Sequence, residues 1–175
     1  MIYEFCAENV TLLEKAMQAG ARRIELCDNL AVGGTTPSYG VTKAAVELAS
    51  NYDTIIMTMI RPRGGDFVYN DLEIDIMLED IRFTAQAGSQ GVVFGVLTAD
   101  KKLDKPNLEK LIAASKGMEI VFHMAFDELS DVDQLEAIDW LSQAGVTRIL
   151  TRAGVSGDSL EKRFAHYHRI LEHAK

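Results

Sequence analysis

The chain has 175 residues, of which 47% are hydrophobic and 25% are charged, and its formal net charge is −8. This size and composition are typical of one globular domain with a substantial core. The acidic balance argues against nucleic acid and anionic membranes as partners, because phosphate contacts need a basic face. No apolar run approaches the roughly 20 residues of a membrane span, and no signal peptide is recognisable. The two cysteines are therefore expected to be free thiols in a reducing cytoplasm.

The first third of the chain alternates between predicted strands and helices. A strand is predicted at Ile2–Cys6, and an apolar stripe at helical spacing follows between residues 10 and 17, with Asn9 as its candidate N-cap. The next two predicted strands are Arg23–Cys27 and Thr54–Ile60. All three strands are short and rich in apolar residues, which is typical of buried parallel strands.

The rest of the chain continues this alternation. The strongest helical stripe runs from Ile74 to Ala85, and it opens with Asn70 and Glu73 in a capping-box pattern. The remaining predicted elements are a strand at Gly91–Gly95, a strand at Glu119–His123, a helix opened by Ser130, a strand at Arg148–Leu150 and a helix from about Leu160 to His173.

A repeated phrase supports this architecture. Gln-Ala-Gly occurs at residues 18–20, 86–88 and 143–145, each time shortly before a predicted strand, as expected for helices that end at a glycine. Six alternating units with helices of ten or more residues predict a parallel α/β sheet, as a barrel or as an open doubly wound sheet. No GxGxxG follows the first strand, and polar residues end most strands, which favours the barrel. We predict a single TIM-like (β/α) barrel domain over residues 1–175, incomplete with six units.

The motif Glu-x-Cys occurs twice, as Glu4 with Cys6 and as Glu25 with Cys27. Side chains two residues apart share one face of a strand, and neighbouring strands lie about 4.8 Å apart. The two thiols are therefore predicted to face each other at the mouth of the barrel. The matched pair indicates a metal or redox role, because soft thiolates on a rigid frame suit Cu(I). The alternatives are that the cysteines are small buried hydrophobes and that the carboxylates pair with an arginine.

Two arginines and two glycines follow the third strand, within residues 61–66. Arg61 and Arg63 are candidates to bind a carboxylate or phosphate bidentately, or else to hold the loop together through Arg–Asp pairs. We expect Arg61 to point into the barrel and pair with Glu4 or Glu25, and Arg63 to lie nearer the loop.

The fifth strand ends at His123, and Asp127 follows four residues later. A histidine at the end of a barrel strand is a candidate for acid–base catalysis or metal ligation, although a lone histidine is more often a structural hydrogen-bonding residue, which Asp127 would orient. Glu4, Glu25 and His123 are predicted to line a polar barrel mouth, and Glu25, His123 and Asp127 are the candidate catalytic residues. The histidines of the last helix are expected on a solvated face without a zinc pattern: His166, His168 and His173.

These motifs resemble the CutC copper-homeostasis family, in order along almost the whole chain. They are Glu4–Cys6, Arg23–Cys27, Gly33–Gly40, Ile60–Phe67, Val93–Thr98, Phe122–His123 and Ala125–Asp127. The arginine–glycine motif is the most specific of them. The resemblance implies a cytosolic barrel protein linked to copper handling, with Cys6 and Cys27 as copper ligands.

The chain departs from the family pattern in two respects. The family has an arginine where this chain has Met124, a loss for which Arg152 at an adjacent strand end is expected to compensate. The family also continues past the sixth helix, and eight units of about 28 residues would need more than about 200 residues. The first and sixth strands are then open edges, which predicts a two-fold homodimer or higher homo-oligomer. The alternative is that the sequence is a truncated form of a longer barrel.

Three functional hypotheses remain open at the level of sequence. The first is a cytosolic copper-homeostasis protein that binds Cu(I) through Cys6 and Cys27. The second is a barrel enzyme that acts on a small anionic metabolite, bound by Arg61 and Arg63, with Glu25 or His123 as acid or base. The third is a binding or structural module without catalysis.

Overall fold

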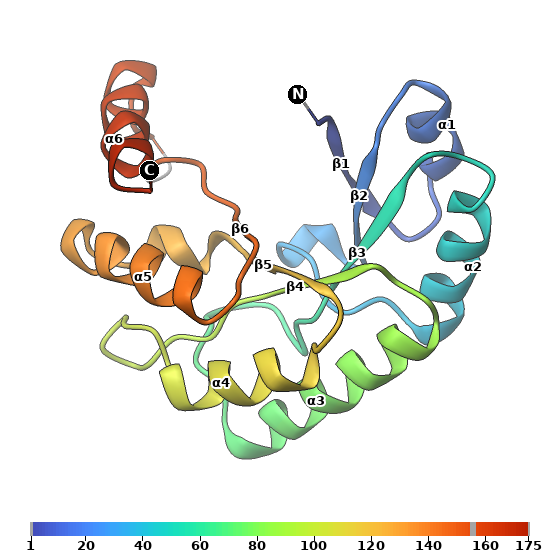
Figure 1. The fold of residues 1–175 in the computed structure, drawn as a ribbon, viewed down its shortest axis with the longest axis horizontal. Coiled ribbons are helices and arrows are strands. Elements are labelled where there is room, and N and C mark those ends of the chain that lie inside the picture. The colour runs from blue at the N-terminus through green and yellow to red at the C-terminus, as the bar shows by residue number, and fades with distance from the viewer. Residues whose placement is uncertain (1, 155–156, 175) are drawn as a thin grey trace.

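The computed structural model describes residues 2–154 and 157–174 and contains one parallel six-stranded sheet (Figure 1). The strands are β1 (Glu4–Glu8), β2 (Arg23–Cys27), β3 (Ile55–Met59), β4 (Gly91–Phe94), β5 (Glu119–Phe122) and β6 (Arg148–Ile149). The α-helices are α1 (Leu13–Gln18), α2 (Tyr39–Ala49), α3 (Asp71–Gln86), α4 (Lys105–Ala114), α5 (Asp131–Gln143) and α6 (Leu160–His173). Two short 3-10 helices complete the fold, η1 (Leu30–Val32) and η2 (Met124–Glu128).

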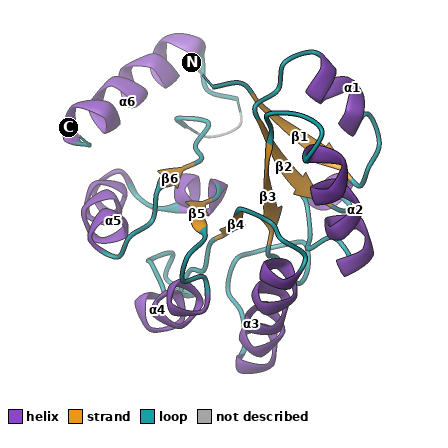
Figure 2. Cartoon of the chain, turned by 45° about the vertical axis from the view of Figure 1, so that its right-hand side comes forward, coloured by secondary structure: helices purple, strands orange, loops and turns teal. Residues whose placement is uncertain are grey.

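The sheet is curled into a half-barrel, which confirms the predicted TIM-like but incomplete barrel. Each strand pairs in parallel with the next one along the chain, in the order β1 to β6. The helices lie on the outer side of the curled sheet, and β1 and β6 are its outermost strands (Figure 2). Within residues 2–154 and 157–174, no helix has both the length and the apolar character that a membrane span requires.

The helix starts show where the sequence-based prediction of local structure succeeds. Asn70 and Glu73 form the expected capping box at α3, and the Ser130 hydroxyl caps α5. Asn9 was wrongly predicted as the cap of α1. Its φ of 56° is left-handed, and its N–H donates to the Cys27 carbonyl at 2.8 Å, so the chain turns before the helix can begin. As a result, α1 begins only at Leu13 and has six residues rather than ten.

Because side chains alternate along the strands, the sheet has an apolar core on its outer face and another on its inner face. Residues such as Ile24, Leu26 and Ile56 point outward and are buried against the helices. The intervening residues point into the half-barrel, where one apolar cluster contains Cys27, Met57, Met59, Val93 and Val121. Gly91 belongs to this inner face, and a Cβ placed there would lie 2.2 Å from the Met57 methyl group. The Met57 side chain therefore fills the space that a side chain at Gly91 would occupy.

A layer of charged residues lies below this apolar cluster. Arg23 on β2 is 5% exposed, and it donates to the Glu4 carboxylate on β1 at 3.2 Å. Its other terminal nitrogen lies 4.0 Å from Glu119 on β5, and Glu119 also pairs with Arg148 on β6. The arginine partner predicted for Glu4 was Arg61, which is wrong. The register pairs Glu4 directly with Arg23, so the nearest guanidinium comes from the neighbouring strand.

Loss of the Arg23 guanidinium should destabilise the fold. The change Arg23→Ala would leave Glu4 and Glu119 without their shared counter-charge, and we expect a loss of about 2 kcal/mol in the free energy of unfolding, less than for a fully buried pair because both carboxylates are partly exposed. Urea denaturation measures this. Arg22→Ala is the matched control, because Arg22 forms an exposed pair with Asp53, worth about 0–1 kcal/mol. Equal losses in the two variants would contradict the role of the buried network.

Candidate metal centre

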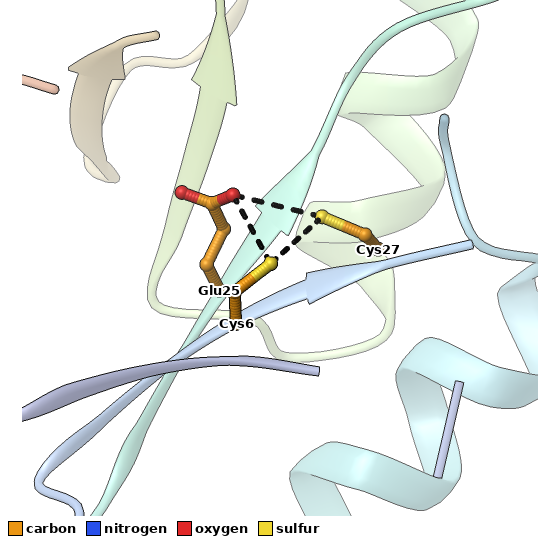
Figure 3. Close-up of side chains that lie close together, drawn as sticks. All are labelled: Cys6, Glu25 and Cys27. Carbon is orange, nitrogen blue, oxygen red and sulfur yellow. Dashed lines mark hydrogen bonds between the residues drawn. The ribbon is translucent and has the colours of Figure 1, made fainter. Parts of the chain in front are cut away.

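Cys6 and Cys27 lie on neighbouring strands and point into the half-barrel (Figure 3). Their sulfur atoms are 4.0 Å apart, as the expectation of facing thiols requires. They are offset by two residues in the register, since Cys6 pairs with Glu25 and Glu8 pairs with Cys27. The Glu25 carboxylate fills the remaining corner, with Oε1 3.7 Å from each sulfur.

These three side chains form the candidate metal centre. One ligand atom from each of Cys6, Glu25 and Cys27 lies within 4.8 Å of the other two, and no other group of this kind occurs in the part of the chain that the structure describes. The strands hold the three side chains in place before any metal binds. A preformed cluster loses little conformational entropy when it binds a ligand.

The two cysteines differ in their access to solvent. Cys27 is fully buried and Cys6 is exposed. Gly34 lies against Cys27, because a Cβ at this position would be 3.2 Å from the Cys27 sulfur, and its φ of 88° favours glycine. The loop after β2 therefore covers the inner thiol and leaves the outer thiol open. The cluster is therefore open to solvent on the side of Cys6.

The protonation of the cluster follows from its burial. Burial and the nearby charge of Glu4 raise the pKa of Glu25. The pKa of Cys27 is also raised, first by its hydrogen bond with Cys6, then by burial and by the charge of Glu25. Both groups hold protons more tightly than they would in water, so metal binding at this cluster must displace protons.

Arg61 does not pair with Glu4 or Glu25, contrary to expectation. Its guanidinium donates to three backbone carbonyls: those of Val32 at 3.0 Å, Gly34 at 2.9 Å and Gly65 at 2.7 Å. These bonds join the loop after β2 to the loop after β3 and engage both terminal nitrogens of the guanidinium. Arg61 thus fixes the loop that covers Cys27.

Arg63 lies in the loop, as expected, and holds it together. It pairs with Glu73 and with Asp66, the latter at 3.0 Å, and donates to the Val68 carbonyl at 2.7 Å. The terminal guanidinium nitrogens of both Arg61 and Arg63 therefore have partners from the chain itself. Anion binding by these two arginines stays a prediction.

His123 is a buried neutral base. Its Nδ1 accepts the Ala125 N–H at 3.2 Å, and its ring packs on Phe67 with centroids 4.8 Å apart. Burial and the positive charge of Arg61 lower the pKa of His123 to about 3. Among the described residues it does not belong to the metal-ligating cluster. Its predicted acid–base role is not tested by this geometry.

Asp127 anchors the loop after β6 and does not bond to His123. Its carboxylate accepts from the Thr151 hydroxyl and from the Arg152 N–H, the latter at 3.0 Å. The Arg152 guanidinium lies 3.5 Å from the Met124 sulfur, so the cation expected to compensate for Met124 is next to it. The candidate catalytic residues Glu25, His123 and Asp127 therefore have three different surroundings.

The histidines of α6 are not all on a solvated face. His166 is half-buried, with Nε2 2.7 Å from the Gln134 side-chain oxygen, which corrects the expectation for this residue. The sequence gives no sign of this contact because its partner is on α5. His168 is exposed. His173 is also exposed, and its Nε2 lies 3.0 Å from a carboxylate oxygen of Asp139.

The sequence model of the CutC family matches residues 1–173. The chain belongs to the CutC family. It is 51% identical over 174 residues to a CutC family protein of Enterococcus faecalis, an alignment that covers 99% of this chain and 83% of the relative. A CutC crystal structure from Streptococcus agalactiae, named as a candidate copper homeostasis protein, has a TM-score of 0.95 at 45% identity and covers 99% of this chain and 83% of its own.

More distant structures share only the fold. An archaeal fructose 1,6-bisphosphate aldolase superposes with a TM-score of 0.61 at 15% identity, over 91% of this chain and 62% of the aldolase chain. This similarity agrees with the TIM-like architecture of the CutC chain, and at this identity it carries no information on chemistry.

The pKa of His123 predicts a pH dependence of stability. Because the folded pKa of about 3 lies below the ordinary value of 6.5, the unfolded chain binds more protons between these values. The contribution of neutral His123 to the free energy of unfolding is complete above pH 6.5 and is lost as the pH falls toward 3. Between pH 7.5 and 5.0 the loss should be about 2 kcal/mol, measured by urea denaturation.

The variant His123→Asn isolates this contribution. An asparagine oxygen can accept the Ala125 N–H in place of Nδ1 and does not titrate. The variant should show a smaller loss of stability between the two pH values than the unmodified chain. An identical pH dependence in both proteins would show that His123 is not the group responsible.

Proposed function

We propose that this CutC protein binds Cu(I) for copper homeostasis, with the thiolates of Cys6 and Cys27 as its ligands. The observation that carries the proposal is the separation of 4.0 Å between two sulfur atoms on neighbouring strands. Soft thiolates on a rigid frame are the donors that Cu(I) prefers over hard oxygen ligands. The name of the Streptococcus agalactiae structure as a candidate copper homeostasis protein supports the same function.

The surroundings of the cluster fit a soft metal ion. Cys27 packs in one apolar cluster with Met57 and Met59, whose thioethers are also soft. Glu25 accepts hydrogen bonds from both thiols and supplies the one carboxylate of the group. A bound Cu(I) would require both thiols to be deprotonated, which leaves one net negative charge beside Glu25. The raised pKa of Glu25 favours its neutral form, which would add no further negative charge to the site.

The enzyme hypothesis has less support. It requires Arg61 and Arg63 to bind an anion, but their terminal nitrogens already donate to carbonyls and carboxylates of the chain. The candidate acid–base residues are also separated, because Asp127 bonds to the loop after β6 rather than to His123.

Cu(I) binding can be measured by competition with bicinchoninate under anaerobic, reducing conditions. We expect one Cu(I) per chain, and Cys6→Ser or Cys27→Ser should each weaken binding by at least about 100-fold, because a two-thiolate site has no redundancy. His168→Ala is the control, since His168 is an exposed histidine outside the cluster. Full Cu(I) binding in either cysteine variant would refute the proposed site.

The proposed thiolate ligands also bear on the cellular compartment in which the protein would function. Oxidation of the two thiols to a disulfide would remove both proposed ligands at once, so the function requires a reducing environment such as the cytoplasm. Quantitative metal analysis of protein purified anaerobically, compared with protein purified in air, tests this dependence.

We further propose that a second copy of the chain covers the open edge of the sheet. Large apolar side chains are exposed at both ends of the sheet, including Tyr3 next to β1 and Leu160 and Phe164 on α6. Unpaired strand edges with apolar neighbours favour association. Sedimentation velocity should give a two-fold dimer, and Phe164→Asp should shift it toward monomer. A monodisperse monomer of the unmodified chain would exclude the dimer.

A further inference from the structure

A cavity lies outside the half-barrel, away from the cysteine cluster. It has a volume of about 310 Å³ and is lined by the loop before α2, the start of α2, the segment after β3 and one face of α3. Figure 2 shows α2 and α3 as neighbouring outer helices. This volume is at the lower limit of sites that bind small molecules. None of the residues of the metal-ligating cluster lines it.

The walls of this cavity are held by hydrogen bonds in the absence of a ligand. Thr36 and Arg61 are joined twice, because the Thr36 N–H donates to the Arg61 carbonyl at 2.9 Å and the Arg61 N–H donates to the Thr36 hydroxyl at 2.9 Å. Ser38 caps α2 by accepting the Val41 N–H at 3.3 Å. The hydroxyls of Thr36 and Ser38 thus already have partners, and the cavity is preformed.

One carboxylate in this cavity has no counter-charge. Asp80 on α3 is half-buried, and burial raises the pKa of its carboxyl group, opposed only by a hydrogen bond with Thr36. Within residues 2–154 and 157–174, no basic side chain lies within ion-pair distance of it. Its neighbour Glu79 pairs with Arg82, so that guanidinium is already neutralised.

The rest of the lining is mixed: hydroxyl side chains and Arg61 form much of it, and three large aromatic or aliphatic side chains form one wall. Tyr39 and Phe83 meet edge to face with ring centroids 6.2 Å apart, and Ile76 adds an aliphatic wall. Arg82 covers one face of Phe83 at 4.0 Å. A hydrated metal cation gains little from such walls, whereas an alkyl or aryl group gains from burial against them.

We propose that this cavity binds a small organic cation, with its ammonium group on Asp80 and its hydrocarbon part against Ile76, Tyr39 and Phe83. A primary amine fits both features, because its charge neutralises the one unpaired carboxylate and its N–H groups donate to it. The inference does not depend on copper binding, since the two sites share no residue.

Isothermal titration calorimetry with butylammonium chloride tests the proposal, with 1-butanol as the neutral probe. We expect saturable binding of butylammonium at millimolar concentration or tighter and none of 1-butanol. Asp80→Asn should weaken butylammonium binding by about tenfold or more, because the charged partner is lost. Asp75→Asn is the matched control on the same helix, since Asp75 is exposed and does not line the cavity.

A second variant separates the apolar part of the site from the charge. Ile76→Ala should weaken butylammonium binding more than methylammonium binding, since only the longer amine reaches this wall. Ile76 is 42% exposed, so the variant is expected to fold. The proposal is overturned if butylammonium does not bind saturably, if Asp80→Asn binds it as well as the unmodified chain does, or if Mg²⁺ competes for the cavity at equal concentration.

Discussion

The position of Arg23 inside the half-barrel is the constraint on which the interior depends. A guanidinium that is almost fully buried must be neutralised, and carboxylates from β1 and β5 do so from opposite sides. Strands that are not neighbours in the sheet are thereby linked across the interior. The alternation of side chains along β2 then determines which residues lie above Arg23 on the same face. Because Arg23 points inward, Glu25 and Cys27 must point inward as well, and Cys6 joins them from β1.

The cluster of Cys6, Glu25 and Cys27 lies above these charged residues and is held by two different kinds of structure. Regular strands position the sulfurs and the Glu25 carboxylate, whereas the loop over Cys27 is closed by the short 3-10 helix η1 and by a pair of backbone hydrogen bonds between Asp28 and Thr35. Arg61 adds to these bonds, because its guanidinium donates to carbonyls of two separate loops. The arginine that appears from sequence to be a ligand-binding group is thus part of the architecture of the site.

Much of the fold could be predicted from local patterns. The bounds of β2 and α6, the capping box at Asn70 and the inward direction of both cysteines all follow from periodicity and capping chemistry. Contacts between distant segments could not be predicted in this way. Whether Glu4 meets Arg23 or Arg61 depends on strand register, and whether Asn9 starts a helix depends on a carbonyl of β2. Periodicity carries no information on either.

Because Cys6 is exposed and Cys27 is buried, the cluster has one side that is open to solvent and one that is closed. If the cluster binds Cu(I) as proposed, an ion carried by another thiol-bearing molecule would meet Cys6 first, since Cys27 lies behind the Gly34 loop. Cys6 would then be the ligand that controls the exchange of the ion, and Cys27 the ligand that retains it.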